Sequence, residues 1–431
     1  MKNIIILAFV IFSVTSPILQ AQELEIDGFV EIDHVSYFKN NNESKINSRN
    51  QGILQMELRS SLGYQASIFS AVEFREDRSD PSRNRIYLDE AYIDLYLGNF
   101  DFRLGKQIIV WGKADGINPT DNITPWDFSD FLDTDDERIG VFALKANYYI
   151  GDWTFEGILI PIFTPSILPL RNSRWFPDFP EEISNPMYPA SGSPTVKTSY
   201  EFLDQTLPDE SFDEAQFAVK LSSTFSGWDV SLSYYSGWNN LATFHRILQP
   251  VSSDSLHIIL QSKYHRRKVA GADFSTTSGK LGIRGEAAYY FTEDPNGEDP
   301  EIDDPYFQYV IGIDRTFSDL IGDNNLFVLI QWIQEIPKNN VEYRKDDLNH
   351  IFQKSITVRL EYELGNYAKL IVEGVYNIKG KDYYLRPNFS YEVTDAVTLD
   401  ICGDILGGES DTFFGSYKDN KRVQVKMKYS F

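Results

Sequence analysis

The last ten residues of the chain, Arg422 to Phe431, constrain its fold more than any other stretch. Polar residues alternate strictly with apolar ones here, and the apolar ones are Val423, Val425, Met427, Tyr429 and Phe431. Successive side chains in a strand point to opposite sides, so this period of two predicts a β-strand with one apolar and one polar face. Other strands of the same sheet are then expected to alternate in the same way.

The chain ends on an aromatic residue directly after this strand. Through Tyr429 and Phe431, the segment resembles the closing strand of bacterial outer-membrane barrels, which typically end in a phenylalanine that the outer-membrane assembly machinery recognises. The resemblance implies the outer membrane of a Gram-negative bacterium, with its lipid and the assembly machinery as partners. A soluble secreted sandwich or propeller is the competing all-β fold, but the sequence shows no blade-length repeat.

The first 21 residues are typical of a secretory signal peptide. The basic residue Lys2 precedes an apolar run from Ile4 to Val14, and small residues lead to Ala21. The run is too short to span a bilayer as a helix, which needs about 20 residues. We therefore expect residues 1–21 to direct export and residues 22–431 to form the mature chain.

The composition fits a barrel with a polar interior. Hydrophobic residues make up 42% of the chain and aromatic residues 14%, which suits an apolar outer face flanked by aromatic girdles. No linker rich in Pro, Gly or Ser divides the mature chain, so we expect one domain over residues 22–431. The single Cys402 excludes an intramolecular disulfide, and the formal net charge of -23 argues against a nucleic-acid partner.

Alternating segments recur along the chain and number about 18, an even count as barrels of this kind require. Short connections alternate with long polar ones, which is the pattern of periplasmic turns and extracellular loops. The stretch from Leu256 to Thr277 could hold one strand or two, and evenness selects one. We therefore predict an all-β fold, a transmembrane antiparallel up-and-down β-barrel of about 16–18 strands, with long extracellular loops at residues 111–137 and 163–212.

The polar faces of these strands would line the interior of the barrel. The charges there could pair across strands and stiffen the wall, or they could form a transverse field that orients a polar or amphiphilic solute. The residues that we expect to line the pore are Arg59, Arg75, Arg103, Arg284, Glu286, Arg359, Glu361, Arg386, Asp400 and Lys426.

The segment from Arg103 to Phe128 is the most distinctive stretch. Glycine, proline, Asp and Asn follow a strand that ends at a tryptophan, and such residues order a loop through fixed turns and side chain to backbone hydrogen bonds. We expect the loop to enter the mouth or lumen and narrow the path, or else to brace the wall. The residues assigned to this constriction are Trp111, Asp115, Asn118, Asp121, Trp126 and Asp127.

The same stretch resembles a segment in an uncharacterised family of proteobacterial outer-membrane proteins. In that family a strand ending in Trp-Gly is followed by a loop with an Asn-Pro or Asn-x-x-Asp-like run. The residues that carry the likeness here are Trp111, Gly112, Asp115, Asn118, Pro119, Asp121, Pro125 and Asp127. Members often look like partners of inner-membrane resistance-nodulation-division exporters, and their architecture is similar to alginate-export and porin-like barrels. The resemblance implies transport, with an envelope exporter as a partner, and it names no substrate.

The second long loop, residues 163–212, contains many prolines together with Trp175, Phe176 and Phe179. Such a length without periodicity is normally functional or disordered, and the aromatic residues argue against disorder. We expect a folded cap or plug that limits the pore. The alternative is an exposed surface that binds a ligand or adheres to a partner.

Catalytic motifs are weak in this chain. Acidic runs at 130–137 and 293–304 could bind calcium, but they lack the spacing of a calcium hand and are expected to be solvated loops. We expect no enzymatic activity, no cofactor and no metal site. None of the histidines lies in a Gly-x-Ser-x-Gly or His-Glu-x-x-His setting; they are His34, His245, His257, His265 and His350.

These features together predict an outer-membrane channel or transport protein that passes a small polar or amphiphilic molecule through a loop-constricted lumen. The alternative is a non-conducting barrel whose extracellular loops bind a ligand or a surface partner. A charged constriction in a pore would favour the first hypothesis, and a filled lumen with an exposed aromatic surface would favour the second.

Overall fold

The computed structural model describes residues 24–39, 47–133, 138–169, 173–177, 179–186, 194–299, 301–321, 324–339 and 348–431. The signal peptide expected at residues 1–21 lies outside the described residues. In the part that is described, no helix is long and apolar enough to cross a membrane. The described helices are short: η1 (Pro81–Arg83), η2 (Phe212–Glu214), η3 (Leu348–His350), α2 (Phe413–Ser416) and η4 (Lys418–Asn420).

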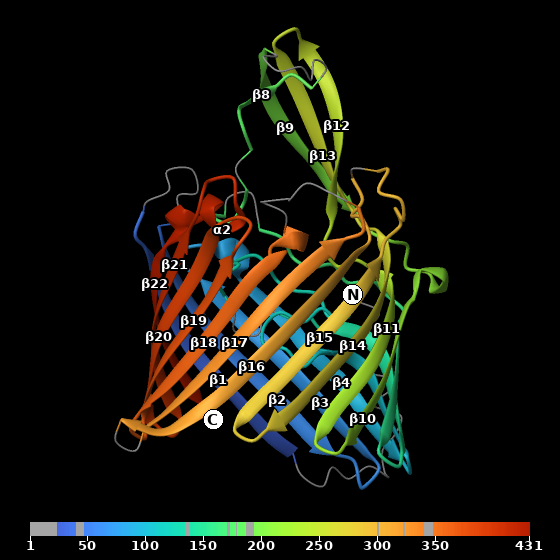
Figure 1. Cartoon of the computed structure of the whole chain (residues 1–431), viewed down its shortest axis with the longest axis vertical. Coiled ribbons are helices and arrows are strands. Elements are labelled where there is room, and N and C mark those ends of the chain that lie inside the picture. The colour runs from blue at the N-terminus through green and yellow to red at the C-terminus, as the bar shows by residue number, and fades with distance from the viewer. Residues whose placement is uncertain are drawn as a thin grey trace.

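Eighteen strands form one antiparallel sheet that closes on itself (Figure 1). The first strand, β1, pairs with β2 on one side and with the last strand, β22, on the other, so the sheet has no free edge. The predicted all-β, antiparallel up-and-down barrel is confirmed. Its strands are β1 (Leu24–Tyr37), β2 (Ser48–Ser61), β3 (Ala66–Asp77), β4 (Arg85–Leu97), β5 (Phe100–Gln107), β6 (Val141–Ile150), β7 (Trp153–Ile160), β10 (Gln216–Phe225), β11 (Trp228–Trp238), β14 (Arg266–Ser278), β15 (Leu281–Phe291), β16 (Tyr306–Ile321), β17 (Asn324–Pro337), β18 (Lys354–Leu364), β19 (Ala368–Asn377), β20 (Asp382–Thr394), β21 (Val397–Gly407) and β22 (Arg422–Ser430).

The faces of the barrel wall reverse the arrangement of a water-soluble protein. In β1 the carboxylates of Glu31 and Asp33 are 7% and 2% exposed, whereas the intervening Val30 and Ile32 are 41% and 59% exposed. The last strand behaves as predicted, since its apolar side chains point outward and its polar ones inward. An apolar outside around a polar interior fits a wall surrounded by lipid.

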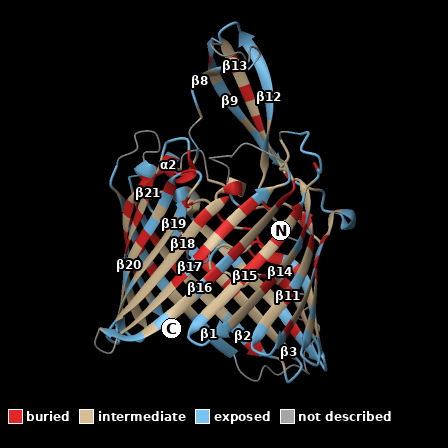
Figure 2. Ribbon diagram, in the orientation of Figure 1, coloured by how far each residue is buried: buried red, intermediate tan, exposed pale blue. Residues whose placement is uncertain are grey.

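The two ends of the barrel differ. Tight turns join the strands at one end, such as the two-residue turn of β10 and β11, where Ser226 and Gly227 both have positive φ (50° and 80°), as a type I′ hairpin requires. Long connections lie at the other end. At this long-loop end inward-facing side chains such as Gln216 and Ala218 are buried, whereas Thr224, at the tight-turn end of the same strand, is exposed. Most buried residues accordingly gather toward the long-loop half of the barrel (Figure 2).

A second sheet of four strands projects beyond the long-loop end (Figure 1). Two of its strands come from the connection between β7 and β10 and two from the connection between β11 and β14, and a parallel pairing of β9 with β13 joins them. Its strands are β8 (Glu182–Ser184), β9 (Thr195–Thr206), β12 (Thr243–Ser252) and β13 (Ser255–Lys263). Its buried apolar residues are Val196, Leu256, Ile258 and Leu260.

Two expectations fail at this projecting sheet. The stretch from Leu256 to Thr277 holds two strands rather than one, because β13 belongs to the projecting sheet and only β14 to the barrel. The loop at 163–212 is folded, but β8 and β9 point away from the barrel instead of plugging it. Its early part lies at the mouth, where the ring of Trp175 packs against Phe131 and Tyr417. Alternation alone marks a strand and does not say which sheet it joins.

Candidate functional site

The connection between β5 and β6, residues 108–140, folds into the barrel; we call it the inward loop. Its described part contacts inward-facing residues of strands all around the wall, among them β2, β4, β7, β15, β17, β20 and β22. The loop is therefore wedged across the lumen rather than folded back on the strands that it connects. An ordered segment inside a polar barrel is the feature around which a functional site can be built.

The middle of the inward loop wraps around the carboxylate of Glu286 on β15. One oxygen, Oε1, accepts hydrogen bonds from the backbone N–H groups of Lys113 and Ala114 and from Asn118 Nδ2 at 3.2 Å. The other, Oε2, accepts from the N–H of Thr120 at 3.4 Å and from its Oγ1 at 2.9 Å. We call this arrangement the carboxylate nest. Glu286 is only 3% exposed, so converging hydrogen-bond donors compensate its charge.

A glycine allows the backbone of the inward loop to approach the carboxylate of Glu286 closely. Gly112 has φ +109°, and a Cβ atom there would lie 2.4 Å from Asn118 Nδ2 and 2.5 Å from Glu286 Oε1. Glycine is the residue that adopts this backbone conformation without steric cost. The Trp-Gly pair singled out in the sequence thus has a local role, which is to turn the chain so that the following N–H groups point at one carboxylate.

Two further contacts hold the same part of the loop. The amide of Gln331 on β17 bonds the backbone of Asp115 in both directions, accepting from its N–H at 2.9 Å and donating to its carbonyl at 2.7 Å. The indole Nε1 of Trp111 donates to Glu156 Oε1 on β7 at 2.6 Å. Trp111 and Gln331 are 3% and 1% exposed, so both contacts are shielded from water.

The far part of the loop is held by buried ion pairs that we call the charged anchor. Asp130 of the loop accepts from Arg49 on β2 at 2.6 Å and from Arg422 on β22 at 2.5 Å. The two arginines also bind wall carboxylates, Arg49 with Asp33 at 2.6 Å and Arg422 with Asp404 at 2.6 Å. The side chains of all five residues are at most 5% exposed. One loop carboxylate thereby joins β1, β2, β21 and β22.

The electrostatics of the charged anchor favour the ionised form of Asp130. Burial alone would raise the pKa of Asp130, but the guanidinium groups of Arg422 and Arg49 outweigh burial and lower it below the ordinary value. The same balance, set by Arg49 and Arg83, lowers the pKa of Asp133. The prediction that the run at 130–137 is a solvated loop is therefore wrong for Asp130 and Asp133, and residues 134–137 lie outside the described part of the chain.

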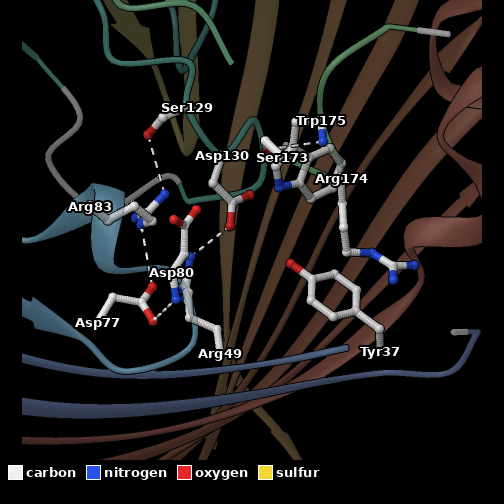
Figure 3. A pocket seen from close by; sticks show the side chains of 10 residues that line it. All are labelled: Tyr37, Arg49, Asp77, Asp80, Arg83, Ser129, Asp130, Ser173, Arg174 and Trp175. Carbon is white, nitrogen blue, oxygen red and sulfur yellow. Dashed lines mark hydrogen bonds and ion pairs between the residues drawn. The ribbon is translucent and has the colours of Figure 1, made fainter. Parts of the chain in front are cut away.

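A cavity of about 40 Å³ lies beside the charged anchor (Figure 3). Its size suits a few water molecules rather than a cargo molecule. Figure 3 shows Arg49 and Arg83 reaching from the wall side toward the inward loop, where Arg83 donates to Ser129 Oγ at 3.2 Å. The residues that line it are Tyr37, Arg49, Asp77, Asp80, Arg83, Ser129, Asp130, Ser173, Arg174 and Trp175.

All ten residues predicted to line the pore occupy inward-facing positions of their strands. Their basic members are paired, which favours the first of the two interpretations, a wall held by ion pairs. The structure does not bring the ten together in one ring. The pairs are Arg59 with Glu57, Arg75 with Glu73, Arg103 with Asp94, Arg284 with Asp314, Arg359 with Glu361 and Glu373, Arg386 with Asp404, and Lys426 with Glu31. Asp400 accepts from Asn388 at 3.5 Å.

The six residues assigned to the constriction all lie in the inward loop. Trp111, Asp115 and Asn118 belong to its middle part, as described above. Three others tie the loop to its own ends and to the wall. Asp121 pairs with Arg138 at 2.6 Å, and the Cζ atom of Arg138 lies 4.1 Å from the centre of the Trp126 ring. Asp127 pairs with Arg85 at 2.8 Å. Burial raises the pKa of Asp121 above its ordinary value.

The second acidic run, 293–304, is solvated over much of its described part, as predicted, since Glu293 and residues 295–299 are exposed, and histidines pair with it. His265 lies 2.8 Å from Glu293, His245 contacts Glu301, and His350 lies 3.4 Å from Asp303. Among the described residues, no group of three or more His, Cys, Asp or Glu is placed to hold a metal ion.

One arrangement of side chains that sequence motifs do not reveal lies on the projecting sheet. His257 Nδ1 is 2.9 Å from Ser199 Oγ, and its Nε2 is 3.1 Å from Glu201 Oε2. The parallel pairing of β9 with β13 sets Ser199 beside His257. The Glu201 side chain is 54% exposed, so the cluster lies at the surface. A nucleophile also needs donors for the developing oxyanion and a bound substrate, and these three contacts supply neither.

Sequence reasoning missed the partners that hold the inward loop. Arg49, Asp33 and Gln331 lie on inward faces that the alternation could have identified. Their roles depend on which strand faces which part of the loop. That pairing is set by barrel closure and cannot be obtained from spacing along the chain.

The fold and its interior loop define the class: this is an up-and-down β-barrel with an apolar outer wall and a loop lodged in its polar lumen. The chain belongs to the family described as "Protein of unknown function (DUF1302)", whose model matches residues 32–302.

Solved structures similar to this chain are barrels at low identity. Salmonella typhi OmpF in complex with daunomycin is 11% identical, with 95% of this chain and 97% of that chain covered and a TM-score of 0.43. A mutant of the Rh. blastica porin is 11% identical, with 95% and 100% covered and a TM-score of 0.42. A loop-deletion mutant of OmpT, an outer membrane protein of Vibrio cholerae, is 10% identical, with 96% and 100% covered and a TM-score of 0.42. Among curated proteins, none matches.

Proposed function

We propose that this protein is an outer-membrane channel for a small polar or amphiphilic molecule, and that the inward loop closes it. The observation that carries the proposal is the position of that loop, wedged across a polar lumen and bonded to the wall on several sides. A barrel of about 16–18 strands is wide enough for an aqueous channel unless something fills it. A loop in that position controls whether the lumen conducts.

The apolar outer wall supports a location in the outer membrane, with lipid and the assembly machinery as partners. An envelope exporter as a further partner rests only on the sequence resemblance. The channel proposal requires no covalent chemistry and no cofactor. Cargo would pass the inward loop only when its middle part leaves the wall.

A disulfide that locks the loop tests the proposal. The Cγ2 atom of Thr120 lies 2.8 Å from the position that a Cβ would take on residue 271, so cysteines at 120 and 271 are within disulfide reach. The variant T120C/G271C is made in a C402S background, because Cys402 is the single native cysteine. Residues 22–431 are refolded, inserted into a planar bilayer and recorded before and after addition of dithiothreitol.

We expect conductance steps that are absent in the oxidised variant and return on reduction. A matched control, S70C in the same background, carries a single added thiol away from the inward loop and is expected to conduct equally before and after reduction. Steps that persist when the loop is locked would show a path that bypasses the loop. Silence of the wild type and of the reduced variant, with a folded barrel on a heat-shift gel, would overturn the channel proposal.

The projecting sheet favours one second candidate, a barrel whose extracellular strands bind a surface partner. One of its two edge strands, β12, pairs with β13 alone among the described strands and exposes Phe244 (41%), Leu248 (44%) and Val251 (69%). Open apolar edges of this kind are usually covered. A folded barrel that does not conduct in the experiment above would favour this candidate.

A further inference from the structure

We propose that the inward loop is a carboxylate receptor, and that a carboxylate on the cargo opens the channel by replacing Glu286 in the carboxylate nest. This inference rests on the proposed channel function and names its substrate class, a small organic carboxylate. In the closed structure the wall itself supplies the carboxylate, so Glu286 is an internal stand-in for the cargo.

The donors of the nest favour a carboxylate over other ligands. Both oxygens of Glu286 are engaged by five donor groups, of which three are backbone N–H groups at Lys113, Ala114 and Thr120. Backbone N–H groups that converge on one point bind anions, and two oxygens on a planar group match donors that approach from two sides. A neutral amide would present its own N–H group to these donors and lose part of the set.

All five donors belong to the loop, and only the acceptor belongs to the wall. If the loop leaves the wall it therefore takes a complete anion site with it, in the backbone conformation that Gly112 imposes. A free carboxylate can satisfy that site, which removes the main cost of breaking the contact with Glu286. Without such a ligand, release would leave several donors and one carboxylate without partners.

The vacated Glu286 also has a second partner within reach. Arg284 precedes it by two residues on the same face of β15 and pairs there with Asp314 of β16. The Arg284 side chain is 28% exposed, so it lies at the edge of the solvated part of the lumen. Glu286 then has two stable arrangements, one in the carboxylate nest and one beside Arg284, and a switch requires two such states.

Solvent has access to this region from the tight-turn end. Interior side chains there remain open to water, as shown by Arg59 at 54% and Lys369 at 44% exposure. A solute that enters from this end meets the mixed charges of the wall first and the inward loop next. The nest is therefore the first tightly bonded barrier on its path.

The decisive comparison uses the refolded chain in a planar bilayer with acetate and, separately, with acetamide as a neutral analogue of the same shape. We expect acetate to raise the open fraction of the wild type by roughly tenfold, which is the change in population that the free energy of one charged hydrogen bond produces. Acetamide should leave the open fraction unchanged. The variant Glu286→Gln is expected to be open in chloride alone and to lose the response to acetate. Glu57→Gln is the matched control, because Glu57 also faces the lumen but pairs with Arg59; it should respond as the wild type does.

A second readout follows the loop itself and does not need conductance. In a C402S background, Ala114→Cys places a thiol on a residue whose backbone N–H belongs to the nest, and a change in its labelling by a maleimide reports release of the loop. We expect acetate, but not acetamide, to increase the labelling rate, and E286Q to raise it without acetate.

The outcomes separate the two proposals. A Glu286→Gln channel that conducts, in a protein indifferent to acetate in both readouts, would overturn the carboxylate inference and leave the channel standing. Acetate-dependent labelling in a protein that never conducts would instead support the receptor and overturn the channel.

Discussion

The carboxylate nest and the charged anchor hold the same loop by different physical means. The nest sets one carboxylate, Glu286, against neutral donors of the loop. The anchor sets Asp130 between two arginines that are themselves paired with wall carboxylates. Every charge in the anchor depends on another buried charge, whereas the nest can exchange its single anion for a similar one.

This difference assigns different roles to the part of the loop in the nest and the part in the anchor. Removing one member of a buried ion network leaves unpaired charges in a region without water, which is strongly unfavourable. Exchanging one carboxylate for another in a set of N–H donors preserves each hydrogen bond. The anchored part near Asp130 is therefore expected to stay fixed as a hinge, and the part from Lys113 to Thr120 is expected to move.

The largest expected effect comes from breaking the anchor. Arg422→Leu removes the partner that Asp130 and Asp404 share and should lower the free energy of unfolding by about 3–5 kcal/mol. Urea unfolding in lipid vesicles, followed by tryptophan fluorescence, measures it. Arg59→Leu is the matched control, because Arg59 is more than half exposed beside Glu57 and such pairs contribute about 0–1 kcal/mol. Equal losses in both variants would remove the distinction between hinge and mobile part.

A smaller effect is expected from distorting the nest. Gly112→Ala forces a side chain into a backbone conformation with φ +109° and into the space of Asn118 and Glu286, at a cost of about 1–3 kcal/mol. Because the strain is relieved when the loop moves, the variant should conduct more while its unfolding midpoint changes little. Gly116→Ala is the control: Gly116 also has positive φ, but nothing lies within 4 Å of its would-be Cβ. If both variants conduct alike, backbone strain alone explains the opening.

The parts of the molecule that could be predicted from sequence are those governed by local periodicity. The final strand shows this well: its alternation gave both its inward and its outward residues correctly, because each face meets a uniform medium, lipid or lumen. The inward course of the loop after Trp111 also agrees with its turn-forming residues. These features depend on neighbours in sequence.

The remaining features depend on encounters between distant segments. Arg422 was recognised as a polar-face residue, but its pairing with Asp130 requires that the last strand close against the first and that the loop reach across the lumen. For the same reason Asp130 was assigned to a solvated acidic run. The strand β13 shows the same limit, since its pattern is that of a strand and its partner β9 comes from another loop.

Gln331 offers a finer test of the mobile part. Gln331→Ala removes two hydrogen bonds to the backbone of Asp115 without touching a charge and should loosen the contact by about 1–2 kcal/mol. Hydrogen exchange of the amide groups at 113–118 is expected to speed up, while exchange near Asp130 stays as in the wild type. Gln424→Ala provides the opposite case, since Gln424 donates to Asp33 of the charged anchor at 3.0 Å. Faster exchange throughout the loop in the Gln331 variant would mean that the part in the nest and the part in the anchor move as one body.

The smallest effect is expected from pH, and its sign follows from the lowered pKa values of Asp130 and Asp133. Both carboxyls bind protons less readily in the folded protein than in the unfolded chain, so their stabilisation is complete above the ordinary Asp pKa of about 3.9 and declines as the pH falls below it. The stability difference between wild type and Arg422→Leu should therefore stay within about 0.5 kcal/mol from pH 7 to 5 and shrink only below about pH 4. Urea titrations at each pH measure it. A difference that already fell between pH 7 and 5 would mean that a group other than these two carboxylates controls the stability of the anchor.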